Sequence, residues 1–348
     1  MIMSSKALQI VPAEAAPAEK PVHGPPLPLE DATVILEEGL AAAAMAMEDY
    51  RAVIRHCSHL VQVAPQHFEA WFNLGVARHQ VDEIEEAVFA YHQAARLQPD
   101  DARPLINMAL ARHALGDRDA ARDTYRAALA LDPSYAPALW NLALLLEASS
   151  SWEEAEMLYA RLSKLQPDWE EALFRQGICM IERQDWDGAA DVFRTCLDRR
   201  ADWKEAALNL ALALLRAKRF ELAQRAFERL QQMAPDSPEA VRGMCAVAIE
   251  AGDIHRALAY RKRLADLRQP VPEITYDLAL LLDQQGRDEE AIRLYSEALK
   301  EQPKFAEALL NLGHLLDRQG RHSEATECWK RALNLNEEYA AAYFRSMG

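Results

Sequence analysis

The chain of 348 residues contains only 12 glycines, and it has almost no runs of valine, isoleucine and threonine. Such runs are typical of strands, so their scarcity argues against a sheet. Alanine and leucine are abundant instead, which favours an all-α fold. No stretch of eighteen apolar residues occurs, so we expect no transmembrane helix. The first twenty residues also lack the basic and then apolar pattern of a secretory leader.

Cysteine and basic residues are also sparse. The five cysteines are irregularly spaced and include no CxxC pair, which argues against a disulfide framework and indicates reduced thiols in a cytoplasmic protein. Lys and Arg number 39 against 54 Asp and Glu, for a formal net charge of −15. A protein that binds phosphate backbones or an anionic membrane needs positive charge on its surface. We therefore expect no nucleic-acid or membrane partner.

The motifs of common catalytic and cofactor sites are missing. The sequence contains no GxGxxG, GxxxxGK[ST], HExxH or GxSxG motif and no zinc-binding spacing. His79 and His113 occupy equivalent places in neighbouring repeats, but two histidines alone do not make a metal site. We predict that the protein is not an enzyme and binds no cofactor or metal.

What the sequence does contain is a repeat of 34 residues, without insertion or deletion. Counted within each repeat, position 20 is alanine in eight of nine copies, position 8 is small, position 24 is mostly aromatic and position 32 mostly proline. Small residues let two helix backbones approach closely, and large rings fill the space between neighbouring repeats. The nine repeats predicted from this register span residues 34–339 and start at residues 34, 68, 102, 136, 170, 204, 238, 272 and 306.

Two segments flank the repeats. Residues 1–33 carry prolines among alanine and glutamate and predict a disordered arm, because dense proline excludes helix and sheet. Residues 340–348 are a partial tenth repeat or a capping helix. Inside the array, the seventh repeat has Arg261 instead of the ring and Gln269 instead of the proline. We expect a softer junction there.

The repeat pattern resembles the tetratricopeptide repeat family. The motif is most complete in one repeat, through Trp71, Leu74, Gly75, Ala87, Tyr91, Ala94 and Pro99. The resemblance covers residues 34–348. It implies an all-α, right-handed superhelical solenoid of tandem antiparallel helix pairs, with the first helix of each pair on the concave face. It also implies a function in protein–protein interaction.

Asparagine recurs at position 6 of the first helices, although it is a mediocre helix former. An amide there offers a donor and an acceptor to the concave groove. The ladder resembles that of O-linked N-acetylglucosamine transferases and kinesin light chains, which implies that these asparagines bind the main chain of a partner. The alternative is that they only link neighbouring helices. From the second repeat on, position 6 holds Asn73, Asn107, Asn141, Arg175, Asn209, Gly243, Asp277 and Asn311.

Position 5, beside the ladder, is mostly apolar. Two interpretations remain open: these side chains complete the packing between consecutive first helices, or they form an exposed apolar lining, which usually marks an interaction surface. The residues concerned are Phe72, Ile106, Trp140, Phe174, Leu208 and Tyr276.

These observations predict a scaffold that binds an extended or short helical segment of a protein partner in its concave groove. The backbone of that segment would pair with the asparagines, and its apolar side chains would contact position 5. One alternative is that the array is the regulatory or substrate-recruiting part of a larger enzyme, such as a glycosyltransferase. Another is self-assembly, in which a second copy fills the groove of a homo-oligomer.

Overall fold

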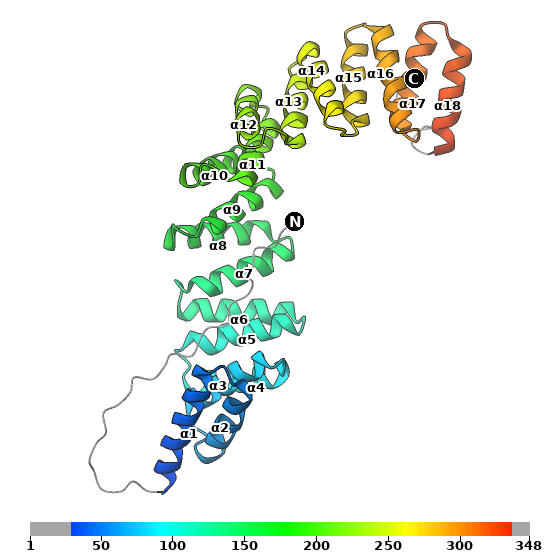
Figure 1. Ribbon diagram of the computed structural model, residues 1–348. Coiled ribbons are helices and arrows are strands. Elements are labelled where there is room, and N and C mark those ends of the chain that lie inside the picture. The colour runs from blue at the N-terminus through cyan, green and yellow to red at the C-terminus, as the bar shows by residue number, and fades with distance from the viewer. Residues whose placement is uncertain (1–28, 336–348) are drawn as a thin grey trace. The chain divides into compact units, whose positions relative to one another are not determined.

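The computed structural model describes residues 29–335, and every regular element in this range is an α-helix (Figure 1). The first helices of the repeats are α1 (Leu29–Ala46), α3 (Phe68–Gln80), α5 (Ala102–Ala114), α7 (Ala136–Ala148), α9 (Glu170–Glu182), α11 (Lys204–Arg216), α13 (Pro238–Glu250), α15 (Pro272–Gln284) and α17 (Ala306–Arg318). The second helices are α2 (Tyr50–Val63), α4 (Ile84–Leu97), α6 (Arg118–Leu131), α8 (Trp152–Leu165), α10 (Trp186–Arg199), α12 (Phe220–Met233), α14 (Ile254–Asp266), α16 (Asp288–Glu301) and α18 (His322–Leu335).

The helices form two compact units, divided between Arg183 and Gln184. In unit 1, which contains α1–α9, each helix contacts the next one along the chain. The same holds in unit 2, which contains α10–α18. Each unit is therefore an all-α solenoid of tandem helix pairs, which confirms the predicted fold class.

Glycine and proline end the helices where the sequence places them. Gly116, at position 15 of its repeat, has a φ of 82° and follows α5, a left-handed conformation that costs glycine little. Second helices end just before a proline, as α4 does at Leu97, because proline disfavours helical backbone at the residue before it. The short connections keep consecutive helices antiparallel and in contact.

The first helix begins earlier than the composition suggested. Residues 29–33 were assigned to the arm, yet α1 begins at Leu29. These five residues contain neither proline nor glycine, so nothing in them opposes the helix. Residues 1–28 of the expected arm, and the expected partial repeat at 340–348, lie outside the described residues.

The core consists of the position 24 rings packed on small residues. Tyr91, Tyr125, Tyr159, Phe193, Phe227 and Tyr295 are all 0 % exposed, as are the position 20 alanines from Ala87 onward. A Cβ atom added to Gly75, at position 8, would lie 2.6 Å from the Tyr91 ring. The small residues at position 8 therefore leave room for the ring of the same repeat.

Gly243 likewise leaves room for a ring, here one from the preceding repeat. It stands at position 6 of α13, and a Cβ atom there would overlap the ring of Phe227 on α12. Phe227 thus occupies the space that a side chain at Gly243 would need, which explains why this repeat departs from the asparagine pattern.

This contact makes a stability prediction. Replacing glycine by alanine inside a helix normally stabilises it by about 1 kcal/mol. We expect Gly243→Ala to lower the free energy of unfolding instead, by about 1–3 kcal/mol, because the Phe227 ring must shift. The double variant Gly243→Ala with Phe227→Leu should be more stable than Gly243→Ala alone. Urea unfolding followed by circular dichroism measures both, and an alanine variant as stable as the wild type would contradict the clash.

The seventh repeat has a polar junction instead of a ring. Arg261 on α14 donates from Nε to the Thr275 hydroxyl at 2.8 Å and from a terminal nitrogen to Glu297 at 2.5 Å. Thr275 is completely buried. The usual apolar contact between position 24 of one repeat and position 4 of the next is therefore replaced here by charge-assisted hydrogen bonds.

Arg261→Met should destabilise unit 2 by about 1–3 kcal/mol, because the buried Thr275 hydroxyl then loses its donor. Arg261→Tyr combined with Thr275→Leu restores the pair found in other repeats and should recover most of this loss. Glu297→Gln is the control, because the Glu297 side chain is 45 % exposed and exposed ion pairs contribute little. Urea unfolding compares the variants. The junction is unimportant if Arg261→Met unfolds at the wild-type midpoint.

Candidate functional site

In unit 1 the first helices α3 and α5 contact one another, and in unit 2 α11, α13, α15 and α17 do so in turn. We define the inner face of a unit as the side of its first helices that carries positions 2, 5, 6, 9 and 13. These positions are three or four residues apart, so they follow one side of a helix. The predicted binding residues all stand at positions 5 and 6 of this face.

In unit 1, three of the predicted position 5 side chains belong to the core. Phe72 and Ile106 are 0 % exposed and Trp140 is 5 % exposed. The Trp140 ring stacks on Trp169 at 4.8 Å and meets Tyr159 edge-on at 5.6 Å between centroids. The prediction that these three residues contact a partner is therefore wrong. They complete the packing between helices, which was the other interpretation of the pattern.

Two of the predicted ladder asparagines are also buried in unit 1. Asn107 is 0 % exposed and Asn141 is 1 % exposed. Burial raises the pKa of Tyr91 and of Tyr125, and a polar interaction with Asn107 and Asn141 respectively opposes that rise. Each amide thus lies beside the ring of the preceding repeat. For these two residues the ladder prediction is wrong, since their side chains are buried between repeats instead of facing a guest.

Arg175 performs the same linking role with a charge. One terminal nitrogen donates to both carboxylate oxygens of Glu147, at 2.9 and 3.0 Å, and Tyr159 donates to Glu147 at 2.8 Å. The guanidinium also lies 5.5 Å from the centre of the Trp140 ring. The carboxylate and the ring hold Arg175 in place, so its charge is neutralised inside unit 1.

The other ladder asparagines remain half-buried. Asn209 donates from its amide to the Glu205 carbonyl, four residues back, at 2.9 Å. Asn311 donates to the Tyr276 hydroxyl of the preceding repeat at 2.8 Å. Asn73 stands at the first position of the ladder, on α3. The five asparagines do not form one continuous row of equivalent groups.

The inner face of unit 2 is open. Leu212, at position 9 of α11, is 39 % exposed, whereas Val76 and Leu110 at the same position of unit 1 are buried. Leu208 and Tyr276 are half-buried. Phe174, the last predicted residue at position 5 of unit 1, is half-buried as well. The exposed apolar side chain at these positions is therefore Leu212, on unit 2.

A column of glutamates at position 2 went unnoticed in the sequence. In unit 2 it consists of Glu205, Glu239, Glu273 and Glu307, of which the first three are exposed. The 34-residue register contained this pattern, but acidic residues are so common on helical surfaces that a column of them did not stand out. With Asp277 at position 6, it makes the open face acidic.

Asp277 is the most perturbed carboxyl group of this face. Partial burial raises its pKa, and the negative charges of Glu250 and Glu273 raise it further. Among the described residues it has no ion-pair partner. Arg261, the neighbouring cation, bonds to Thr275 and Glu297 instead.

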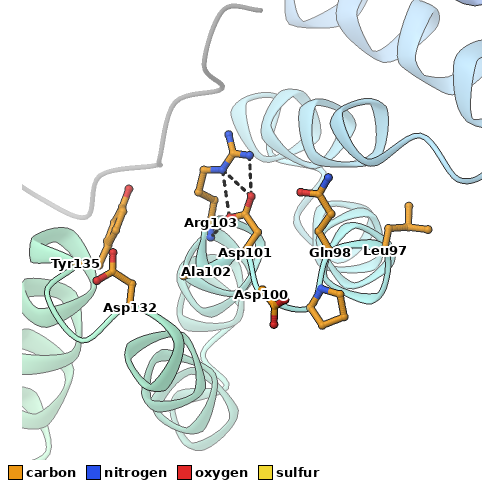
Figure 2. Close-up of a pocket in the computed structure, with 9 residues that line it drawn as sticks. Leu97, Gln98, Asp100, Asp101, Ala102, Arg103, Asp132 and Tyr135 are labelled. Atoms are coloured by element: carbon orange, nitrogen blue, oxygen red, sulfur yellow. Dashed lines mark hydrogen bonds and ion pairs between the residues drawn. The ribbon is translucent and has the colours of Figure 1, made fainter.

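A separate cavity of about 680 Å³ opens in unit 1, between the loops before α5 and α7 (Figure 2). Figure 2 shows Asp132 and Tyr135 on one side and the Arg103–Asp101 pair on the other. Arg103 donates to Asp101 at 2.7 Å and lies 5.2 Å from the centre of the Phe72 ring. Its charge is thus compensated, and the cavity offers carboxylates without any nucleophile or base arranged for catalysis.

Within residues 29–335, no group of three or more His, Cys, Asp or Glu could hold a metal ion. No helix in the same range is both long and apolar enough to cross a membrane.

Family models described as tetratricopeptide repeat match most of the array. One matches residues 68–101. A second matches residues 112–174 and 180–247. A third matches residues 247–306 and 276–338. Taken together, these matches extend over well more than half of the chain.

No curated protein matches the chain. Among solved structures, MamA is 19 % identical with a TM-score of 0.46, over 49 % of this chain and 93 % of that one. A tetratricopeptide repeat protein from Parabacteroides merdae is 19 % identical with a TM-score of 0.44, over 72 % and 98 %. YrrB, described as a TPR protein with an unusual peptide-binding site, is 16 % identical with a TM-score of 0.39, over 64 % and 97 %.

The environment of Asp277 makes a pH prediction. Because its pKa is higher in the folded than in the unfolded state, protonation favours folding and ionisation at neutral pH opposes it. We expect Asp277→Asn to raise the urea midpoint at pH 7. This gain should shrink as the pH falls through the folded-state pKa, since the wild-type carboxyl then becomes neutral too. Glu327→Gln, an exposed change on α18, should leave the urea midpoint unchanged. Equal midpoints for the two variants at pH 7 would show that ionised Asp277 does not destabilise the fold.

Proposed function

Because the chain belongs to the tetratricopeptide repeat family, we propose that it is a non-catalytic scaffold that binds an extended or short helical segment of a protein partner along the inner face of unit 2. One observation carries this proposal. Leu212 on α11 is 39 % exposed, and Leu208 and Tyr276 of unit 2 are half-buried. On α3 and α5 of unit 1, the side chains at positions 5 and 9 are buried in the core. Accessible apolar side chains rimmed by polar ones are typical of an interaction surface.

The residues of this face match the needs of a bound chain. Leu208, Leu212 and Tyr276 offer apolar contacts to alternate side chains of an extended segment. The Asn209 amide already donates to its own helix, so its side-chain oxygen is the group that can accept a backbone N–H from the guest. The proposed site therefore keeps Leu208, Asn209, Tyr276, Asp277 and, at its far end, Asn311.

The five cysteines support a location in a reducing compartment. All five are buried and none forms a disulfide, and burial raises the pKa of Cys57, Cys179 and Cys245 to about 12. Such thiols are unreactive and need no partner. We propose the cytoplasm on this basis. No observation on residues 29–335 favours recruitment for a larger enzyme or self-assembly over the scaffold.

Peptides selected from a random displayed library test the binding face. Leu212→Ser should weaken the selected peptides by about tenfold, because a central apolar anchor contributes about 1–2 kcal/mol to an interface. Leu222→Ser is the matched control, since Leu222 lies on α12, a second helix, and is 46 % exposed. Isothermal titration calorimetry gives the affinities. Equal affinity for the Leu212→Ser and Leu222→Ser variants would rule out the inner face of unit 2 as the binding site.

A further inference from the structure

The carboxylates of the inner face are treated differently in the two units. In unit 1, Glu69 at position 2 lies 3.3 Å from Arg103, and Glu171, also at position 2, lies 3.3 Å from Arg175. Glu147 is bound to the same Arg175 at 2.9 Å. Each of these acidic groups thus has an arginine from a first helix within ion-pair distance. Glu182, at position 13 of α9, is exposed and enters no ion pair with another described residue, so the pairing in unit 1 concerns Glu69, Glu147 and Glu171.

The corresponding carboxylates of unit 2 have no such partner among the described residues. Glu205, Glu239 and Glu273 are exposed at position 2 and enter no ion pair with another described residue, and the same holds for Glu250 and Asp277. The α15 sequence contains no basic residue at all. This unit therefore leaves a row of uncompensated negative charge along α13 and α15.

Three arginines share the inner face of unit 2. Arg242, at position 5 of α13, donates to the Pro270 carbonyl at 3.0 Å, and Arg318, at position 13 of α17, lies 2.7 Å from both Asp283 and Asp288. Arg216, at position 13 of α11, is exposed and enters no ion pair with another described residue. None of the three is paired with Glu250, Glu273 or Asp277, the carboxylates whose charges act on one another at the junction of α13 and α15.

We infer that the segment bound by unit 2 is basic, with Lys or Arg side chains that contact Glu250, Glu273 and Asp277 while apolar side chains contact Leu208, Leu212 and Tyr276. This inference rests on the proposed function, since it names the chemistry of the same partner. Two observations carry it: Leu212 is exposed on this face, and the position 2 carboxylates of unit 2 are unpaired where Glu69 and Glu171 of unit 1 are paired. Complementary charge selects a partner and speeds its association.

The partner most compatible with this face presents basic and apolar side chains along neighbouring edges of an extended segment. A polyproline II segment has three residues per turn, so a basic and an apolar residue that each recur at every third place follow two such edges. All four first helices from α11 to α17 carry a glutamate at position 2, and α13 adds Glu250 at position 13. The apolar side chains proposed for binding lie on α11, with Leu208 and Leu212, and on α15, with Tyr276. A guest that lies across α11, α13 and α15 therefore meets both kinds of contact.

Three peptides of equal length test the inference: four repeats of Lys-Leu-Pro, of Gln-Leu-Pro and of Glu-Leu-Pro. Proline keeps each of them extended. Fluorescence anisotropy measures their affinity for the full chain at low and at high salt. We expect the lysine peptide to bind at least tenfold tighter than the glutamine peptide at low salt. This advantage should be lost at about 1 M NaCl, where the screening length falls to about 3 Å.

A triple variant identifies the charges responsible. Glu250→Gln with Glu273→Gln and Asp277→Asn should reduce the lysine peptide to the affinity of the glutamine peptide. The matched control removes as many charges from second helices, through Glu221→Gln, Glu289→Gln and Glu327→Gln, and should retain the full preference. Circular dichroism and the urea midpoint show that each variant is folded.

The outcomes separate the two proposals. If lysine and glutamine peptides bind equally and both weaken with Leu212→Ser, the face binds a partner but the basic chemistry is wrong. The same conclusion follows if the inner triple variant and the control triple variant behave alike. If no peptide binds, or if Leu212→Ser changes nothing, both the basic partner and the proposed function are overturned.

Discussion

In the repeats that have one, the position 24 ring is the contact on which the rest of the molecule depends. It is enclosed by a small residue at position 8 of its own repeat and by position 6 of the following one, as Phe227 is by Gly243. A buried ring contributes more packing than any other side chain in a helix pair. Because the ring reaches the next repeat, it also fixes what position 6 can be: an amide, a guanidinium or no side chain at all.

This constraint divides the two units by role. In unit 1 the inner-face residues serve the repeats themselves, since Trp140 packs on Trp169 and Arg175 pairs with Glu147. In unit 2 the same positions leave leucines accessible and carboxylates unpaired. A repeat protein has this freedom because each repeat is stabilised by its neighbours and not by a single central core. Some repeats can therefore use their inner-face residues to stabilise the array, while others keep those residues available for a partner.

The sequence predicted the architecture better than the site, for a physical reason. The alanine column at position 20, the rings at position 24 and the glycine at Gly116 report local packing and turns, and the structure confirms each of them. Whether Asn107 faces a groove or a tyrosine depends on how closely two repeats approach, which spacing along the chain does not reveal. Likewise, Glu171 and Glu273 both stand at position 2 of their repeats. Glu171 has an arginine, Arg175, within ion-pair distance, whereas Glu273 has none among the described residues.

The buried cysteines make local opening of the helices measurable in this protein. Cys57, Cys179, Cys196, Cys245 and Cys328 are distributed along the array, and each is shielded in the native state. A thiol reagent can reach one of them only when the helices around it separate. The rate at which each thiol is modified thus reports how often the helices around it open, without any engineered label.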